Sequence, residues 1–304
     1  MKLYKYVPFQ RISFLQDRLI RFTQPHLLND PWEIQTNYDR VFPEGTWEKL
    51  HEESIDEVSD ISDKVFDDLI DKIGNDPENR EIIEDFRQQF ASQHGPVYED
   101  FLRFIEPNFI EVCSFFEKQA EDLASLAGRQ MGVLSLAELP DDPTMWAHYA
   151  DEHRGFVIEF DSSHPFFTGE DGGSEPERRL HKIAYADEPP KAPVLFPDTD
   201  LEWAEVERRF FTKHSSWTYE KEWRVVRRLK EADKVIASKD DDICLFEVPA
   251  VCVTGVVLGC RMAPDQRQQI LDLLNANHEL AHVVASELVN DKRQYKLILR
   301  PVAR

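Results

Sequence analysis

The stretch "SSWTYEKEWRVVR", residues 215–227, combines two carboxylates with three large aromatic side chains. Its apolar, basic end is typical of a β-strand. Side chains two residues apart share one face of a strand, so Glu220, Glu222 and Arg224 are expected to point the same way. A solvent-facing Glu–Arg pair would be an ordinary surface feature that contributes little. The aromatic neighbours favour the other interpretation, in which the strand is packed and presents paired carboxylates to a cleft.

A carboxylate pair at the mouth of a cleft can perform two kinds of chemistry. One carboxylate can bind a substrate hydroxyl, while the other orients a nucleophile or stabilises a developing positive charge. Glu222 and Glu220 are therefore the candidate catalytic residues.

The pattern along the rest of the chain predicts more strands than helices. Hairpins are more frequent than βαβ units, so the expected fold is α+β with a mixed, mainly antiparallel sheet. The other expected strands are residues 3–7, 18–24, 132–136, 155–161, 181–186, 243–249, 252–259, 282–289 and 294–302, and the expected helices are 9–17, 142–153, 201–214 and 263–277.

Residues 46–130 differ in composition from the rest of the chain. Apolar residues recur there at helical spacing, and residues 44–100 alone hold 18 acidic and 5 basic side chains. The predicted domains are therefore an α+β catalytic-type core, residues 1–45 and 131–304, and an acidic helical insertion, residues 46–130. The acidic face of this insertion is a candidate docking site for a protein partner.

The formal net charge of −22 argues against a general binder of nucleic acid or of membrane surfaces. No apolar run reaches the length of a bilayer span, and the start "MKLYKYVPFQ" lacks the apolar region of a signal peptide. The chain is expected to be cytoplasmic, with no membrane partner.

Four cysteines are present, and three of them lie at eight-residue spacing in apolar stretches. This spacing matches neither a metal site nor a disulfide framework, so buried, reduced thiols are expected. The cysteines are Cys113, Cys244, Cys252 and Cys260.

A second dense cluster of candidate residues lies in "TMWAHYADEHRGFVIEFD", residues 144–161. On a helix, His148 and Tyr149 lie next to Trp146, where the rings could serve a binding site or pack in the core. His148 and His153 are five residues apart and do not share a helix face, so no metal site is expected.

Six segments of the chain together resemble a bacterial family named domain of unknown function 2971. They occur in order over almost the whole chain, with the helical stretch as a variable insert. The segments are "LYKY", "RFTQPHLLNDPWE", "VLSLAE", "MWAHYADEHRGFVIEFD", "KHSSWTYEKEWRVV" and "VTGVVLG".

The order of parts also resembles, more loosely, the ADP-ribosyltransferase fold. "YEKEWRVV" is similar to the Glu-x-Glu strand of those enzymes, which implies Glu222 as the catalytic carboxylate, Glu220 as its partner and NAD as the substrate. The chain departs from that pattern at two places. Ser135 stands alone where those enzymes have a Ser-Thr-Ser motif, and Lys5 stands where they have a histidine or arginine. Arg21, one strand later, is the candidate to replace that histidine or arginine. The NAD-binding residues implied by the resemblance are Tyr4, Lys5, Tyr6, Arg21, Ser135, Trp146, His148 and Tyr149.

The resemblance implies an NAD-dependent ADP-ribosyltransferase or an NAD glycohydrolase, acting as a toxin or phage-defence effector on NAD and a macromolecular target. Two alternatives remain open from the residues. One is a nuclease that uses the acidic side chains around a divalent metal. The other is a non-catalytic sensor or adaptor that docks a partner on its acidic insertion.

Overall fold

The computed structural model of the chain describes residues 1–32, 37–40, 128–169, 178–193, 210–239, 241–291 and 293–304, and single positions at 66, 67, 70, 77, 80, 81, 83–85, 87 and 118. The chain forms two compact units. The first comprises Met1–Gln35, Leu126–Pro189 and Val206–Arg304, and the second comprises Thr36–Ser125 and Pro190–Glu205. The predicted helical insertion and Cys113 fall almost entirely outside the described residues, so those two predictions stay predictions.

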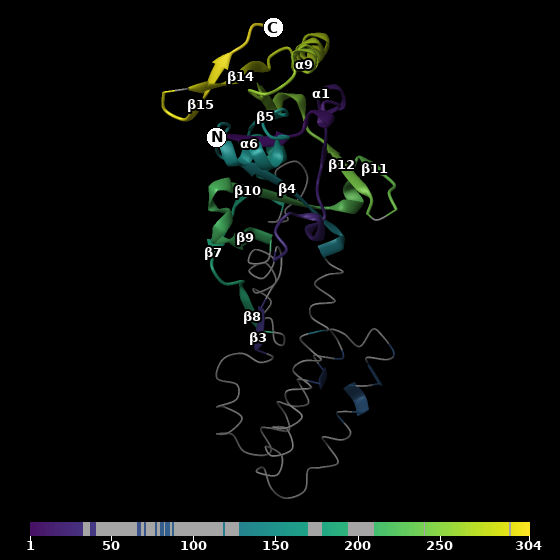
Figure 1. Cartoon of the computed structure of the whole chain (residues 1–304). Helices are drawn as coiled ribbons and strands as arrows, with labels where there is room; N and C mark the ends of the chain where they lie inside the picture. Colours follow the sequence, from purple (N-terminus) through teal and green to yellow (C-terminus); the bar gives the residue numbers. More distant parts are fainter. Residues whose placement is uncertain are drawn as a thin grey trace, which may run out of the picture. The chain divides into compact units, whose positions relative to one another are not determined.

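The first unit is built on an eight-stranded sheet with the order β15-β14-β13-β5-β1-β4-β10-β6 (Figure 1). Its neighbouring strands are antiparallel except β13 and β14, which are parallel. The predicted α+β class with a mixed, mainly antiparallel sheet is therefore confirmed. The strands are β1 Lys2–Val7, β4 Met131–Ala137, β5 Phe156–Asp161, β6 His181–Lys182, β10 Glu222–Arg228, β13 Val253–Leu258, β14 Val284–Asp291 and β15 Lys296–Pro301.

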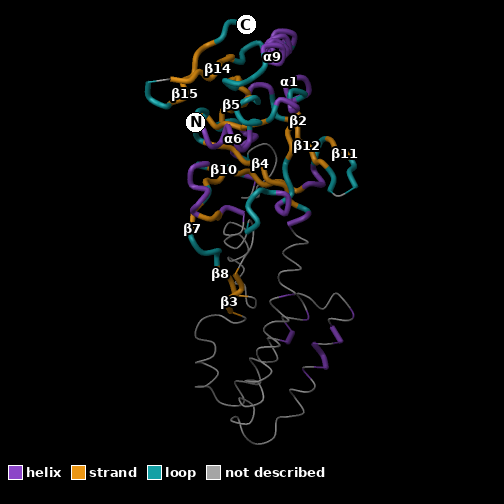
Figure 2. The backbone as a smooth tube through the Cα atoms, in the orientation of Figure 1, coloured by secondary structure: helices purple, strands orange, loops and turns teal. Residues whose placement is uncertain are grey.

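Smaller sheets and short helices complete the described structure (Figure 2). One antiparallel sheet has the order β11-β12-β2 and consists of β11 Lys234–Ile236, β12 Ile243–Glu247 and β2 Leu19–Arg21. Two further sheets are parallel pairs. They are β7 Ala184–Ala186 with β9 Thr212–His214, and β3 Asn37–Arg40 with β8 Lys191–Pro193. The α-helices are α1 Phe14–Asp17, α6 Pro143–Tyr149, α7 Pro165–Thr168 and α9 Pro264–Ala276, and the 3-10 helices are η1 Phe9–Arg11, η2 Pro25–Leu27, η4 Ser215–Glu220, η5 Leu229–Glu231, η6 Ala250–Cys252 and η7 His278–Leu280. None of the helices in the described part of the chain is long and apolar enough to cross a membrane.

The start of α6 is set by its own sequence. The Asp142 side chain accepts hydrogen bonds from the backbone N–H groups of Thr144 and Met145, and Pro143 occupies the first turn, where its missing N–H costs nothing. The helix buries Trp146 completely, and the indole N–H donates to the carbonyl oxygen of Pro140 at 2.8 Å. This packing holds Tyr149, at the helix end, beside the sheet.

Three sequence-based predictions of local structure are wrong. Residues 9–17 form two short helices, because the first turn is closed by tight bonds such as Arg11 N–H to Pro8 O. Residues 212–214 are a strand rather than the end of a helix, paired with β7. The expected strand 215–227 begins only at Glu222, since residues 215–220 form η4.

The described cysteines lie within or beside the core. Cys244 and Cys252 are buried and Cys260 is partly buried. The predicted burial is thus confirmed for the first two.

Gly155 lies where two backbone segments approach closely. A Cβ at this position would be 2.2 Å from the carbonyl oxygen of Val7, and backbone atoms cannot move aside as a flexible side chain can. We expect Gly155→Ala to lower the free energy of unfolding by about 1–3 kcal/mol, as overpacking does. Urea denaturation measures this change.

Gly128→Ala is the matched control, because a Cβ there would meet Pro25 Cγ at an ordinary 3.8 Å. Equal stability of the two alanine variants would contradict the close approach at Gly155.

Candidate functional site

The large sheet is opened between β1 and β4. These strands share a single residue pair, Tyr4 with Ala137. By contrast, β1 pairs with β5 over six residues and β10 with β4 over seven. On one side of the Tyr4–Ala137 pair, the Lys5 ammonium donates to the carbonyl oxygen of Ser135 at 2.9 Å, in place of a backbone ladder. The separation of the strands leaves room for a cavity inside the sheet.

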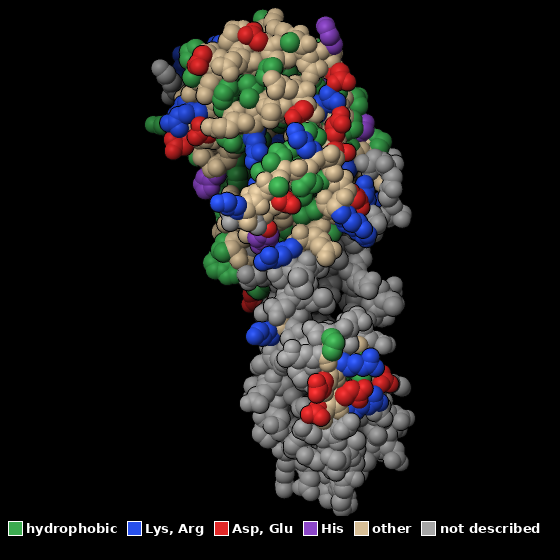
Figure 3. All heavy atoms as spheres, turned by 90° about the vertical axis from the view of Figure 1, so that its right-hand side faces the viewer, with side chains coloured by type: hydrophobic (Ala, Val, Ile, Leu, Met, Phe, Trp, Pro, Cys, Tyr) green, Lys and Arg blue, Asp and Glu red, His purple; other side chains and the backbone are tan. Residues whose placement is uncertain are grey.

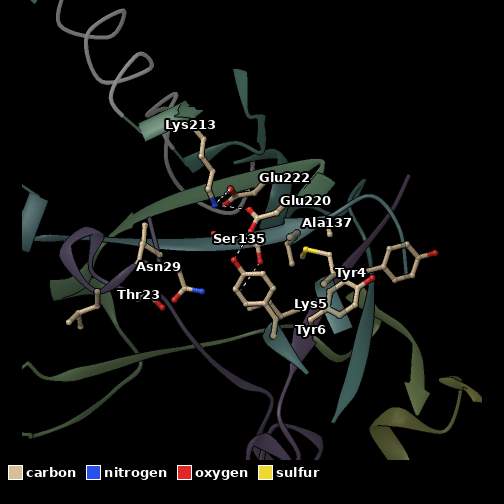
Figure 4. Close-up of a pocket in the computed structure, with 15 residues that line it drawn as sticks. Tyr4, Lys5, Tyr6, Thr23, Asn29, Ser135, Ala137, Lys213, Glu220 and Glu222 are labelled. Atoms are coloured by element: carbon tan, nitrogen blue, oxygen red, sulfur yellow. Dashed lines mark hydrogen bonds and ion pairs between the residues drawn. The ribbon is translucent and has the colours of Figure 1, made fainter. Parts of the chain in front are cut away.

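A cavity of about 220 Å³ lies at this opening (Figure 4). Its walls come from β1, η2 and the residues that follow it, β4, α6, β9, η4 and β10. The lining residues are Tyr4, Lys5, Tyr6, Thr23, Leu27, Leu28, Asn29, Ser135, Leu136, Ala137, Met145, Tyr149, Lys213, Glu220 and Glu222.

Seven of the ten residues singled out from the sequence line this cavity: Tyr4, Lys5, Tyr6, Ser135, Tyr149, Glu220 and Glu222. The other three lie elsewhere. Trp146 is fully buried behind Tyr6, with the two rings 5.4 Å apart. His148 is exposed, 6.2 Å from the Tyr219 ring, and Arg21 lies on β2 near Gln24.

The two carboxylates reach the cavity in a different way from that expected of one strand. Glu220 ends η4 and Glu222 begins β10, while Lys221 between them adopts a left-handed conformation with φ of 45°. Their side chains are nevertheless 4% and 3% exposed, so the solvent-facing alternative does not apply.

Glu222 is held mainly by Arg224, two residues further along β10. Arg224 Nε donates to Glu222 Oε1 at 2.7 Å and Nη2 to Oε2 at 2.9 Å, a two-point contact. Arg224 is fully buried, and its Nη1 donates to the carbonyl oxygen of Phe210 at 2.8 Å. The Ser135 hydroxyl also hydrogen-bonds Glu222. This network fixes the Glu222 carboxylate in one orientation.

Lys213 joins the two carboxylates. Its ammonium lies 2.6 Å from Glu220 Oε2 and 3.2 Å from Glu222 Oε2. Glu220 also accepts a hydrogen bond of 2.5 Å from the Tyr149 hydroxyl. The Lys213 ammonium further lies 4.7 Å from the centre of the Trp217 ring, a cation–π contact.

Burial changes the acid–base properties of the groups around the cavity. It raises the pKa of Glu222 to about 7. The charge of Lys213 lowers this pKa, and the like charge of Glu220 raises it further. Burial lowers the pKa of Lys5 to about 8, although Glu222 and Glu220 act in the other direction. Burial and the Glu220 charge raise the pKa of Tyr149. Groups that titrate near neutral pH in a cavity are typical of functional sites.

Two buried cations of the site were missed or undervalued by sequence reasoning. Arg224 had a visible signal, since its spacing from Glu222 places both on one strand face. Lys213 had no such signal, because it precedes the carboxylates by seven and nine residues in a segment expected to be helical.

Among the described residues, no group of three histidine, cysteine or acidic side chains could hold a metal ion.

The surface around the first unit carries both charge signs. Figure 3 shows Lys or Arg side chains interspersed with Asp or Glu side chains among the described residues of the face it draws. Ion pairs on the described surface of the first unit include Arg178 with Glu231 and Lys182 with Glu138. Such a surface differs from the positive face with which a protein binds a nucleic-acid duplex.

Fold and cavity together define an α+β protein with a buried carboxylate pair at an opening of its main sheet. The family model described as "Protein of unknown function (DUF2971)" matches residues 145–225, a segment that includes most of α6, all of β5 and both carboxylates of the cavity. This match supports, over the matched segment, the resemblance that the motifs indicated. Comparisons with the curated proteins and with the solved structures gave no match.

Proposed function

We propose that this protein cleaves the nicotinamide–ribose bond of NAD, as an ADP-ribosyltransferase or an NAD glycohydrolase with an ADP-ribosyltransferase-like fold. The supporting observation is the convergence of four segments, around residues 4–6, 135, 149 and 220–222, on one cavity. These are the segments from which a site of this kind was expected. The role as a toxin or phage-defence effector is part of the proposal and rests on the resemblance alone.

The dimensions and lining of the cavity suit the nicotinamide end of NAD. Pockets for whole drug-sized ligands measure about 300–1,000 Å³, so a cavity of about 220 Å³ would take one part of the molecule. Tyr4, Tyr6 and Tyr149 provide aromatic surface for the nicotinamide ring. The diphosphate would lie towards Lys5, whose ammonium supplies a positive charge.

The chemistry follows from the charges at the site. The bond between ribose C1′ and the nicotinamide nitrogen breaks, and its electron pair leaves with the nicotinamide. The ribose then carries positive charge, which the Glu222 carboxylate stabilises while it accepts a hydrogen bond from a ribose hydroxyl. Water or an acceptor group attacks C1′, and Glu220 takes the proton released. A fixed, desolvated carboxylate stabilises such a cation more strongly than one in water.

The same contacts weigh against the two alternatives. The Lys213 ammonium lies between the two carboxylates, in the position that a divalent ion would take in a metal-dependent nuclease. A sensor or adaptor has no need to bury two carboxylates in a cavity, at the desolvation cost that burial imposes.

Incubation of the purified protein with NAD tests the proposal. We expect release of free nicotinamide, measured by chromatography, in the presence of a chelator of divalent metals. Label from NAD that remains on protein or nucleic acid would indicate a transferase, and free ADP-ribose a glycohydrolase. In a parallel sample with magnesium and without the chelator, cleavage of nucleic acid without consumption of NAD would support the nuclease instead.

Lys5 should make the use of NAD depend on pH. Its ammonium is charged below a pKa of about 8 and neutral above it, so attraction for the NAD diphosphate is lost as the pH rises through that value. Contacts to a charged group contribute about 1.5–3 kcal/mol, so we expect the KM for NAD to rise about tenfold between pH 7 and pH 9.5. Steady-state kinetics measure this change.

In Lys5→Met the KM should be high at both pH values. A wild-type KM that stays constant over this interval would exclude Lys5 from diphosphate binding.

A further inference from the structure

Lys213 is the side chain that links the two carboxylates of the site. It lies on β9, outside the strand and 3-10 helix that carry Glu222 and Glu220, and its side chain is only 5% exposed. Its ammonium contacts both carboxylates, at 2.6 and 3.2 Å, whereas Arg224 contacts Glu222. Figure 4 shows the lysine side chain reaching down to the pair from its own strand.

Two buried carboxylates this close to one cation form an electrostatic unit. Without a shared positive charge, their mutual repulsion and the loss of solvent favour protonation of one of them. Although burial acts in the other direction, Glu222 and Glu220 raise the pKa of Lys213, so the lysine stays charged across the physiological range. A permanent ammonium at this point offsets the repulsion and restricts where each carboxylate can lie.

We propose that Lys213 is a positioning residue for the proposed NAD cleavage: its ammonium holds Glu220 and Glu222 together on the cavity wall and favours the ionised form of Glu222. This inference rests on the proposed function for its consequence in catalysis. The contacts on which it depends do not involve NAD.

The other groups around Glu222 define what a test must control. Arg224 lies on the same strand as Glu222, Glu220 lies on η4 and Ser135 lies on β4. Tyr185 lies on β7, and its hydroxyl accepts a hydrogen bond of 2.9 Å from the backbone N–H of Glu222. Lys5 on β1 acts on Glu222 at longer range. Each of these groups is retained in a variant in which only Lys213 is replaced.

The test is an NMR titration of the side-chain carboxyl carbons in protein labelled with ¹³C-glutamate, with Glu222 assigned by comparison with Glu222→Gln. In Lys213→Met we expect the midpoint for Glu222 to rise by at least about one pH unit. Lys213→Arg keeps the charge and should titrate within about half a unit of the wild type. A folded Lys213→Met with the wild-type midpoint would overturn the proposal.

Two further measurements complete the experiment. Circular dichroism shows whether Lys213→Met folds. If it does not, the double variant Lys213→Met/Glu220→Gln is compared with the single variant Glu220→Gln, and equal Glu222 midpoints in these two proteins would overturn the proposal.

The pH–rate profile for nicotinamide release in Lys213→Met gives a second measurement. Its acid limb should move to higher pH together with the Glu222 midpoint, and an unmoved limb would exclude a role of Lys213 in catalysis. If the wild type releases no nicotinamide, the proposed function fails, while the titration still decides whether Lys213 controls the carboxylate.

Discussion

Glu222→Gln is expected to lower the rate of nicotinamide release from NAD at least about 100-fold, the effect typical of removing one electrostatic contact to a transition state. Glutamine has the size of glutamate but carries no charge to stabilise the ribosyl cation. The carboxylate is 3% exposed, so solvent screens its charge poorly and the loss should be large. Initial rates at saturating NAD measure the change.

Glu138→Gln is the matched control for that substitution. Glu138 follows Ala137 on β4 and accepts hydrogen bonds from Lys182 and the Trp223 indole, outside the cavity lining. It should retain the wild-type rate. Nicotinamide release by folded Glu222→Gln at the wild-type rate would exclude Glu222 as the catalytic carboxylate, and thermal denaturation of both variants shows whether each is folded.

Arg224→Met is expected to produce the largest loss of stability, about 3–5 kcal/mol, because it leaves a buried charge without its main partner. Arg224 is fully buried and makes two hydrogen bonds to Glu222 and one to the carbonyl oxygen of Phe210. Burial lowers the pKa of Arg224 to about 9, which leaves it charged at neutral pH. Methionine fills the space but donates no hydrogen bond.

The free energy of unfolding from urea denaturation measures this loss. Arg228→Met, four residues further along β10 and exposed, should change stability by less than about 0.5 kcal/mol, as surface substitutions usually do. Equal effects of the two substitutions would show that the Glu222–Arg224 contact contributes no more than an ordinary surface pair.

Local patterns predicted most of the described strands, because alternation of apolar and polar side chains depends only on neighbouring residues. The same pleating predicted that Glu222 and Arg224 share a face, and they do. The predicted strand is absent at residues 215–220, where the β-prone aromatic residues form η4. There the left-handed Lys221 turns the chain before β10 begins, and no residue-by-residue preference signals such a conformation in a lysine.

The resemblance to the family, the α+β class and most of the candidate site could be read from the order of residues alone, since these depend on motifs and on short-range periodicity. The opening between β1 and β4, the burial of both carboxylates and the place of Lys213 between them could not. Each of these depends on contacts between segments far apart in the chain, such as Lys5 with Ser135 and Lys213 with Glu222. Pairwise distances of that kind, and the loss of solvent that gives their charges strength, exist only after the chain has folded.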